Sequence, residues 1–232
     1  MISIRKANDR GLTQIDWLKS YHTFSFGEYY DPTHMGFGTL RVINEDSVKP
    51  GMGFGTHQHR DMEIISYVIS GALEHKDSMG TGSIIKPGEI QRMTAGKGVA
   101  HSEFNASQTD PVHFLQIWIT PAQKDLKPSY EQKTLPQDKF NELLLIGSEK
   151  GGRHAIIIHQ KAELYVAYLK SQASVTHEFK QHHKGWLQLI KGQVSVNDKT
   201  LHAGDGAGFQ IAGSVTITGV EDAEFLLFDL AN

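Results

Sequence analysis

Two short stretches decide the fold and the chemistry of this sequence. The first, GMGFGTHQHRDME, covers residues 51–63, and the second, GKGVAHSEFN, covers residues 96–105. In each stretch one residue separates two potential metal ligands, and residues i and i+2 of a β-strand point to the same face. Two such strands lying side by side bring three imidazoles and one carboxylate to one point. The predicted ligands are His57, His59, His101 and Glu103.

This ligand set predicts a transition-metal centre. Nitrogen and oxygen donors together suit Fe, Ni, Cu, Mn or Zn better than Mg or Ca, which prefer oxygen alone. Four protein ligands on a metal that accepts five or six leave one or two positions open. Two alternatives remain, namely ordinary hydrogen-bonded histidines and a closed structural zinc site. The double spacing argues against the first, and the second usually relies on cysteine, which the chain lacks.

The composition describes an ordinary globular protein and excludes several classes of function. The 232 residues are 39% hydrophobic and 21% charged, and the absence of cysteine excludes disulfide scaffolds, zinc ribbons, iron–sulfur clusters and thiol catalysis. The net charge of −3 and the scattered basic residues argue against nucleic-acid binding. The chain shows neither a secretory signal nor an apolar run that spans a membrane. We therefore expect a soluble, cytoplasmic protein.

The pattern of turns predicts an all-β fold that is duplicated along the chain. Turn signals recur every eight to twelve residues or so, and hardly any segment has a helical period, which is typical of a β-sandwich or barrel. The second half loosely repeats the first: Ser70-Gly71 matches Lys191-Gly192, and Lys86–Glu89 matches His202–Asp205. Self-similarity of this kind predicts two related β-domains.

The expected domains are a metal-binding one over residues 1–128 and a second one over residues 129–232. The proline-containing stretch around their junction is the best linker candidate. Counting back from the matched glycine places Glu178 and Lys180 at the positions of the first histidine pair. Apolar or weakly polar residues fall at the positions of the second pair. We therefore expect the second domain to keep the scaffold without the metal.

The sequence also resembles the cupin superfamily and, within it, the pirin family of two-domain cupins. The first cupin motif is approximated within residues 51–71, and the second by Gly98, His101 and Asn105. The pirin-like segments are more specific and lie within residues 1–120, whereas the remainder matches by general pattern. These segments are His22–Phe26 (HTFSF), Tyr30–Pro32 (YDP), Arg41–Asn44 (RVIN), His57–Ile64 (HQHRDMEI) and Met93–Glu103 (MTAGKGVAHSE).

The resemblance implies two jelly-roll barrels of the cupin type in tandem, with one metal held by the four ligands of the N-terminal barrel. Glu63, which belongs to the general cupin motif, is implied to be a non-ligand. Fe(II) is the metal expected first, with Ni, Cu, Co, Mn or Zn as alternatives. Bacterial pirin-like proteins are similar to quercetin 2,3-dioxygenases, which open a flavonol ring with O2 and release carbon monoxide. We therefore expect a dioxygenase that takes a small aromatic substrate and O2.

Two other functions stay open at this point. Some members of the family look like transcriptional co-regulators, so a non-catalytic, metal- or redox-sensing protein that acts through a protein partner is the main alternative. Cupins host many reactions, so an O2-independent isomerase or decarboxylase acting on a sugar or keto acid is a weaker one. A largely apolar pocket, which we expect from the sequence, favours the aromatic substrate.

Several residues are candidates for roles beside the metal. Glu103 is expected to serve both as a ligand and as the catalytic base that takes a hydroxyl proton. Arg60 is a candidate for orienting an anionic substrate, although an arginine at a strand end is more often a solvated charge. The residues expected to line a substrate pocket, or else to form barrel core, are Phe26, Phe54, Met93 and Phe114.

Three histidines in the second half suggest another metal site. They are His177, His182 and His183. Adjacent histidines on a strand face opposite ways, so a solvated loop is the favoured interpretation.

Overall fold

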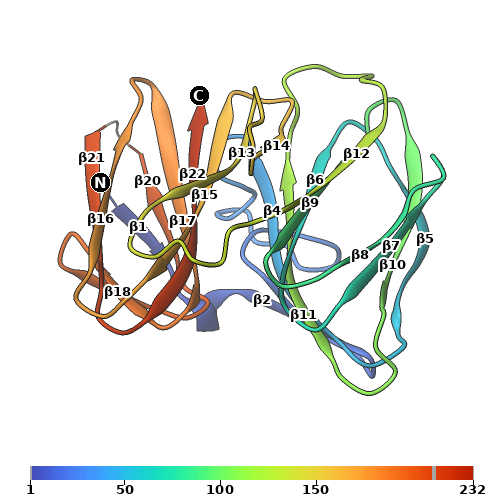
Figure 1. The fold of residues 1–232 in the computed structure, drawn as a ribbon, viewed down its shortest axis with the longest axis horizontal. Helices are drawn as coiled ribbons and strands as arrows, with labels where there is room; N and C mark the ends of the chain where they lie inside the picture. Colours follow the sequence, from blue (N-terminus) through green and yellow to red (C-terminus); the bar gives the residue numbers. More distant parts are fainter. Residues whose placement is uncertain (1, 211–212, 232) are drawn as a thin grey trace.

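Nearly all of the regular secondary structure is β-strand, and the strands form two barrels lying side by side (Figure 1). The computed structural model describes residues 2–210 and 213–231. Each barrel combines a seven-stranded sheet with a four-stranded sheet. The expected all-β fold with two tandem barrels is therefore confirmed. Within the described residues, no helix is long and apolar enough to cross a membrane.

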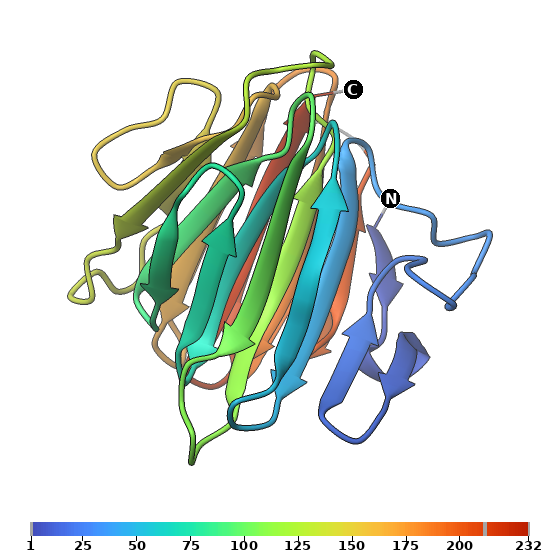
Figure 2. The same cartoon turned by 90° about the vertical axis from the view of Figure 1, so that its right-hand side faces the viewer.

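The N-terminal barrel contains eleven strands. Their bounds are β2 (Gly11–Gln14), β3 (Leu18–His22), β4 (Leu40–Val48), β5 (Gly53–His59), β6 (Glu63–Ser70), β7 (Leu73–Asp77), β8 (Gly82–Ile85), β9 (Glu89–Thr94), β10 (Val99–Asn105), β11 (Val112–Ile119) and β12 (Ser129–Thr134). The larger sheet has the order β12-β9-β6-β11-β4-β3-β2, and the smaller has the order β5-β10-β7-β8. Figure 2 shows this barrel with the smaller sheet toward the viewer.

The C-terminal barrel is built in the same way. Its strands are β1 (Ile2–Arg5), β13 (Leu144–Ser148), β14 (Ile156–Ile157), β15 (Ala162–Leu169), β16 (Ser174–Phe179), β17 (His183–Lys191), β18 (Gln193–Val196), β19 (Lys199–His202), β20 (Gly206–Phe209), β21 (Gly213–Gly219) and β22 (Ala223–Ala231), and a short 3-10 helix, η1 (Ala7–Asp9), follows β1. The larger sheet has the order β1-β20-β17-β22-β15-β13-β14, and the smaller has the order β16-β21-β18-β19.

Two matched glycines show how closely the barrels repeat each other. Gly71 and Gly192 end corresponding turns with φ of 80° and 76°. A Cβ at Gly71 would lie 2.6 Å from the Pro111 carbonyl oxygen, and one at Gly192 would lie 2.1 Å from the Asp222 carbonyl oxygen. Both positions therefore require glycine for two reasons. The backbone is left-handed, and the backbone of a neighbouring segment leaves no room for a Cβ. The predicted duplication is thus visible in the turns as well as in the strand order.

The register of the outer sheets identifies the C-terminal counterparts of the ligand positions. Glu103 on β10 pairs with His75, which is the fourth residue after Gly71. Ile217 on β21 pairs with Val196, which is the fourth residue after Gly192. Ile217 therefore corresponds to Glu103, and Val215 corresponds to His101. The strand partner of Val215 is His177, which thus occupies the position of the first histidine of the N-terminal pair.

This register corrects the counterparts expected from the sequence. Glu178 and Lys180, predicted at the positions of His57 and His59, have exposed side chains instead, so that prediction is wrong. The same number of residues counted back from Gly192 and from Gly71 does not reach equivalent positions. The count is shifted by one residue because β17 has nine residues where β6 has eight. In the part of the chain that the structure describes, both groups of side chains able to hold a metal lie in the N-terminal barrel.

The two barrels exchange strands across the junction at residue 128. β1 pairs with β20 of the C-terminal sheet, and β12 pairs with β9 of the N-terminal sheet. Each barrel therefore includes a strand from the other side of that junction. The division into residues 1–128 and 129–232 stays a prediction for the domains, whereas the hydrogen-bonded sheets interleave the two segments.

The core of the molecule lies between the two large sheets, which face each other in the middle of Figure 1. One cluster of fully buried side chains joins both halves, including Ile43 and Ile117 from the N-terminal sheet and Leu164 and Phe228 from the C-terminal sheet. Burying aliphatic and aromatic area on both faces of this contact stabilises the pair of barrels as one unit. The other face of each large sheet lines the interior of its own barrel.

We expect Gly192→Ala to destabilise the fold strongly. The added Cβ meets the carbonyl oxygen of Asp222 in a left-handed backbone, so the free energy of unfolding should fall by about 3 kcal/mol or more. Gly80→Ala is the matched control, since Gly80 has φ of 90° and no atom lies within 4 Å of the place its Cβ would take. It should lose only about 1 kcal/mol. Urea unfolding measures both, and equal losses would contradict a role for packing at Gly192.

Candidate metal centre and its cavity

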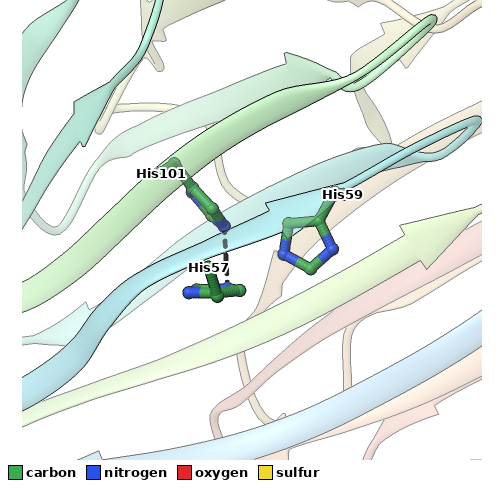
Figure 3. A group of neighbouring side chains, drawn as sticks. All are labelled: His57, His59 and His101. Carbon is green, nitrogen blue, oxygen red and sulfur yellow. Dashed lines mark hydrogen bonds between the residues drawn. The ribbon is translucent and has the colours of Figure 1, made fainter.

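Two neighbouring strands of the small N-terminal sheet bring three histidines together. β5 and β10 are antiparallel, with His57 opposite His101 and His59 opposite Val99. Because His57 and His59 are separated by one residue, both rings lie on the face that His101 shares (Figure 3). One ring nitrogen from each histidine lies within 4.8 Å of the others. The structure therefore brings the three imidazoles of the predicted set to one point.

Glu103 belongs to a second group that overlaps the first. A β-bulge follows His101, so that Glu103 lies opposite Phe54. Its carboxylate shares a 4.8 Å group with His101 and His75, not with all three imidazoles of the first group. Ser66 Oγ donates to one carboxylate oxygen at 3.1 Å, and Gln116 Nε2 donates to the other at 2.6 Å. These two hydrogen bonds fix the carboxylate beside the cluster.

The sequence reasoning missed His75. It lies on β7, is fully buried, and stands two residues before Asp77. A signal was present, because His75 and Asp77 repeat the one-residue spacing that marks the other ligand pairs. Without knowing that β7 lies beside β10, this third pair could not be placed near the first two.

The spacing of the imidazole nitrogens fits a bound transition metal. His57 Nδ1 donates to the Gly55 carbonyl oxygen at 2.8 Å, so in the neutral ring Nε2 carries only a lone pair. This Nε2 lies 3.1 Å from His101 Nε2. Two nitrogens that each lie about 2.1 Å from one ion are about 3.0 Å apart at a right angle and about 3.4 Å at the tetrahedral angle. The observed separation is that of two ligands on one metal.

Burial keeps the imidazoles of His59 and His101 uncharged, which is the form that binds metals. Burial, followed by the neighbouring His57 and His59, lowers the pKa of His101 to about 2. Burial and the neighbouring His57 lower the pKa of His59 to about 4. Burial also raises the pKa of Glu103 above its usual range, although the hydrogen bond from Gln116 opposes this. A cation beside these groups would restore the ionised form of the carboxyl group.

A cavity of about 280 Å³ opens beside the cluster, at the lower end of the usual size for ligand sites. His57, His59 and Glu103 form part of its wall. Its apolar side is built from Leu18, Phe26, Phe54 and Trp118. The Trp118 ring packs edge-on against His59, with 4.9 Å between the ring centroids. Most of the cavity surface is apolar, which agrees with the expectation from the sequence.

The cavity wall also carries polar side chains, a feature that the sequence did not predict. It contains Ser20, His22, Asn44, Asp46 and Gln116. Asp46 Oδ1 is buried and finds no hydrogen-bond partner in residues 2–210 and 213–231. Burial raises the pKa of this carboxyl group to about 7. An unpaired buried oxygen beside a cavity is suited to receive a polar group of a ligand.

The structure separates the predicted pocket residues into two sets. Phe26 and Phe54 line the cavity. Met93 and Phe114 are fully buried in apolar clusters and are not part of its wall. Arg60 is 65% exposed and forms ion pairs with acidic residues of nearby loops, so its side chain lies at the surface outside the cavity.

Glu63 lies apart from both metal-capable groups. It is fully buried, and one of its oxygens accepts hydrogen bonds from Thr94 Oγ1 at 3.2 Å and from the His159 backbone nitrogen at 3.1 Å. These contacts tie β6 to a segment of the C-terminal half.

The three histidines of the C-terminal barrel do not all lie in a solvated loop, so that interpretation is corrected in part. His177 Nε2 donates to Asp229 Oδ2 at 2.9 Å, and His183 Nδ1 donates to Asp229 Oδ1 at 2.6 Å. Asp229 is fully buried. Of the three histidines, only His182 is exposed. The two inner histidines therefore pair with a buried carboxylate.

Comparison with known proteins agrees with this fold and site. The pirin family matches residues 4–119, and the quercetinase C-terminal cupin domain matches residues 145–230. The chain is 44% identical over 231 residues to a quercetin 2,3-dioxygenase of Escherichia coli (strain K12), with 99% of each protein covered. It is 37% identical to a pirin-like protein of Caulobacter vibrioides, with 100% of each covered. The bacterial pirin YhhW from Escherichia coli, solved in complex with nickel(II), superimposes with a TM-score of 0.95 at 42% identity, covering 100% of this chain and 99% of that chain.

Fold, site and similarity together define a bicupin, in which two cupin barrels stand in tandem and the N-terminal one carries a candidate metal centre. Within that class, the chain belongs to the pirin family. The resemblance noted in the sequence motifs is confirmed.

The lowered pKa values of His59 and His101 should reduce the stability of the metal-free protein as the pH falls from about 6.5 to about 4. Histidines of the unfolded chain take up protons below about pH 6.5, whereas His101 and His59 resist protonation until about pH 2 and about pH 4 in the folded state. At these two positions the unfolded state then binds more protons, which decreases the free energy of unfolding, while the raised pKa values of Asp46 and Glu103 act in the opposite direction. The comparison with a variant isolates the histidine: His101→Leu should remove up to about 1.4 kcal/mol per pH unit of this decrease. Urea unfolding measures it, and exposed His202→Gln should leave it unchanged.

Proposed function

We propose that the protein is a metal-dependent dioxygenase of the quercetin 2,3-dioxygenase type, with Fe(II) as its metal and a flavonol-like aromatic compound and O2 as its substrates. The proposal depends on one observation: the three-histidine cluster borders a cavity whose wall carries both aromatic and polar side chains. The name of the Escherichia coli relative supports the reaction. The nickel(II) complex of the related pirin supports a bound transition metal.

The chain's own residues account for binding the metal. His57, His59 and His101 would hold it through uncharged ring nitrogens, and Glu103 would be the fourth ligand. When bound, the metal supplies a positive charge for an anionic substrate oxygen and a redox centre for O2. Three neutral imidazoles and one carboxylate leave a divalent ion with a net charge of +1, which favours a deprotonated hydroxyl group as the substrate's first contact.

Glu103 is also placed to take the proton that this hydroxyl group gives up. Its carboxylate is part of the cavity wall, and burial raises its pKa, so it accepts a proton more readily than an exposed carboxylate does. The hydrogen bonds from Ser66 and Gln116 hold its orientation while the proton arrives. Glu103 is therefore the catalytic base of the proposed reaction.

The cavity wall offers two kinds of contact to an aromatic substrate. Phe26, Phe54 and Trp118 offer flat apolar surfaces and exclude water from the reacting oxygen. Asp46, whose Oδ1 has no partner among the described residues, would bind a hydroxyl group of the substrate. A hydroxylated aromatic compound makes both kinds of contact, which a purely apolar ligand does not.

Aerobic incubation of the metal-loaded protein with quercetin tests the proposal. Loss of the flavonol absorbance with release of carbon monoxide is expected when Fe, Ni, Cu, Co or Mn is bound, and Glu103→Gln should lower kcat by about 10²- to 10⁴-fold. Metal content is measured on each variant to separate lost catalysis from lost metal. Glu45→Gln, at a carboxylate paired with Arg10 outside the cavity, is the control. No turnover with any of these metals, or turnover that needs no O2, would contradict the dioxygenase.

Asp46→Ala should raise KM for quercetin by about tenfold or more, because one hydrogen bond to a buried carboxyl group is lost. The same variant should bind an analogue that lacks the distal hydroxyl groups as well as the unaltered protein does. Ser47→Ala, on the neighbouring position of β4 that faces away from the cavity, is the matched control. Steady-state kinetics with both compounds measures the difference. An equal effect on the two compounds would argue against recognition by Asp46.

A further inference from the structure

A buried histidine and a buried aspartate lie directly behind the metal centre, on the strand next to β10. In the register of β7 and β10, His75 pairs with Glu103 and Asp77 pairs with His101. The side chains of His75 and Asp77 are both completely inaccessible to solvent. Neither residue is part of the cavity wall, so neither is placed to touch a substrate.

Asp77 is held as a carboxylate that accepts hydrogen bonds on both oxygens. Oδ1 accepts from the backbone nitrogens of Met79 at 2.9 Å and Thr81 at 3.0 Å. Oδ2 lies 3.0 Å from His75 Nε2. Because both backbone N–H groups donate to Oδ1, the oxygen left for His75 is Oδ2. An ionised carboxylate only accepts, so His75 must carry its hydrogen on Nε2 and present a lone pair at Nδ1.

Four contacts then run in a line from a carbonyl oxygen to this carboxylate. They join Gly55 to His57 (2.8 Å), His57 to His101 (3.1 Å), His101 to His75 (3.5 Å) and His75 to Asp77 (3.0 Å). Both ends of the line are acceptors. Three neutral imidazoles supply one N–H hydrogen each, so three hydrogens are available for four contacts. One contact is therefore left without a hydrogen, and a cation can take its place.

The position of that cation follows from the surroundings of the two central contacts. The contact between His57 and His101 is flanked by His59, which brings a third ring nitrogen, and it borders the cavity. The contact between His101 and His75 is flanked by the Glu103 carboxylate, but both histidines are buried and neither is part of the cavity wall. The metal therefore belongs between His57 and His101. The hydrogen of His101 then lies on Nδ1 and points at the lone pair of His75.

We propose that His75 and Asp77 are positioning residues that fix the tautomer of His101, so that its Nε2 is free for the metal. This proposal depends on the metal centre of the proposed function and not on the dioxygenase reaction. Asp77 sets the hydrogen of His75, His75 sets the hydrogen of His101, and His101 presents its lone pair to the ion. Hydrogen bonds behind a metal ligand of this kind typically change metal affinity by about 10- to 100-fold.

Asp77→Asn tests the proposal with a nearly isosteric change. The amide oxygen keeps the contacts with Met79 and Thr81, and the amide nitrogen now faces His75 as a donor. His75 must then move its hydrogen to Nδ1, and His101 must move its own to Nε2, where it blocks metal binding. In metal-free, ¹⁵N-histidine-labelled protein, NMR should show the tautomer of His75 reversed and the hydrogen of His101 fixed on Nε2. Calorimetry with nickel(II) as the probe should show an affinity about 10- to 100-fold lower.

Two variants of His75 separate positioning from direct ligation and from general damage to the fold. The amide of His75→Gln can donate to Asp77 and accept from His101, so tautomer and nickel affinity should stay within about threefold of the unaltered protein. His75→Leu offers neither contact, and its affinity should fall by about tenfold or more. If His75→Gln abolishes nickel binding as His101→Ala does, His75 is itself a ligand and the proposal is overturned.

Asp229→Asn is the matched control in the other barrel, because Asp229 is also fully buried and also accepts from histidines. It should change neither the tautomer of His101 nor the nickel affinity. If Asp77→Asn leaves both unchanged as well, the proposal fails whatever the activity toward quercetin. If Asp77→Asn does not fold, the contrast between the two His75 variants gives the same decision.

Discussion

The central constraint of this structure is the contact of 3.1 Å between two ring nitrogens, His57 Nε2 and His101 Nε2. When the hydrogen of His101 lies on Nδ1, both nitrogens carry lone pairs, which repel each other unless a positive charge lies between them. A proton is a poor solution, because burial holds the pKa of His101 near 2. A metal ion with open coordination positions is a good one, because it uses both lone pairs and that of His59. The cluster thus depends on a cation, and the neighbouring residues hold the ring nitrogens in place to bind it.

The C-terminal barrel supports this site without taking part in its chemistry. Its histidine at position 159 donates to the buried Glu63 on β6, the strand that also carries Ser66 and so orients Glu103. Arg92 on β9 donates to the Ile157 carbonyl oxygen, which ties the same sheet to the second half of the chain. A metal site needs ligands that do not move when the ion leaves. A barrel without metal ligands of its own therefore still has a structural role, because its contacts hold the other barrel rigid.

The sequence predicts which side chains share a face much better than it predicts how deep along the barrel they lie. His57, His59 and His101 follow from the one-residue spacing, because alternation on a strand is a local property. The same alternation makes Phe114 and Met93 candidates for the cavity wall, yet both lie where side chains of neighbouring strands fill the interior. Depth depends on register between distant strands, which no local pattern contains. The partner of a ligand, such as His75, depends on the same register.

The two barrels place different charged partners beside their inward-facing histidines. Trp118 on β11 pairs with Ile64, and Asp229 on β22 pairs with Gly185, which makes Asp229 the counterpart of Trp118. In the N-terminal barrel the apolar Trp118 packs against His59 and leaves the imidazole lone pairs for a cation. In the C-terminal barrel the carboxylate of Asp229 takes that place, and its histidines donate hydrogens to it instead. An inward-facing histidine needs a charged partner at this position of the barrel. Whether the residue on the neighbouring strand is a tryptophan or an aspartate decides whether that partner is a metal ion or a carboxylate.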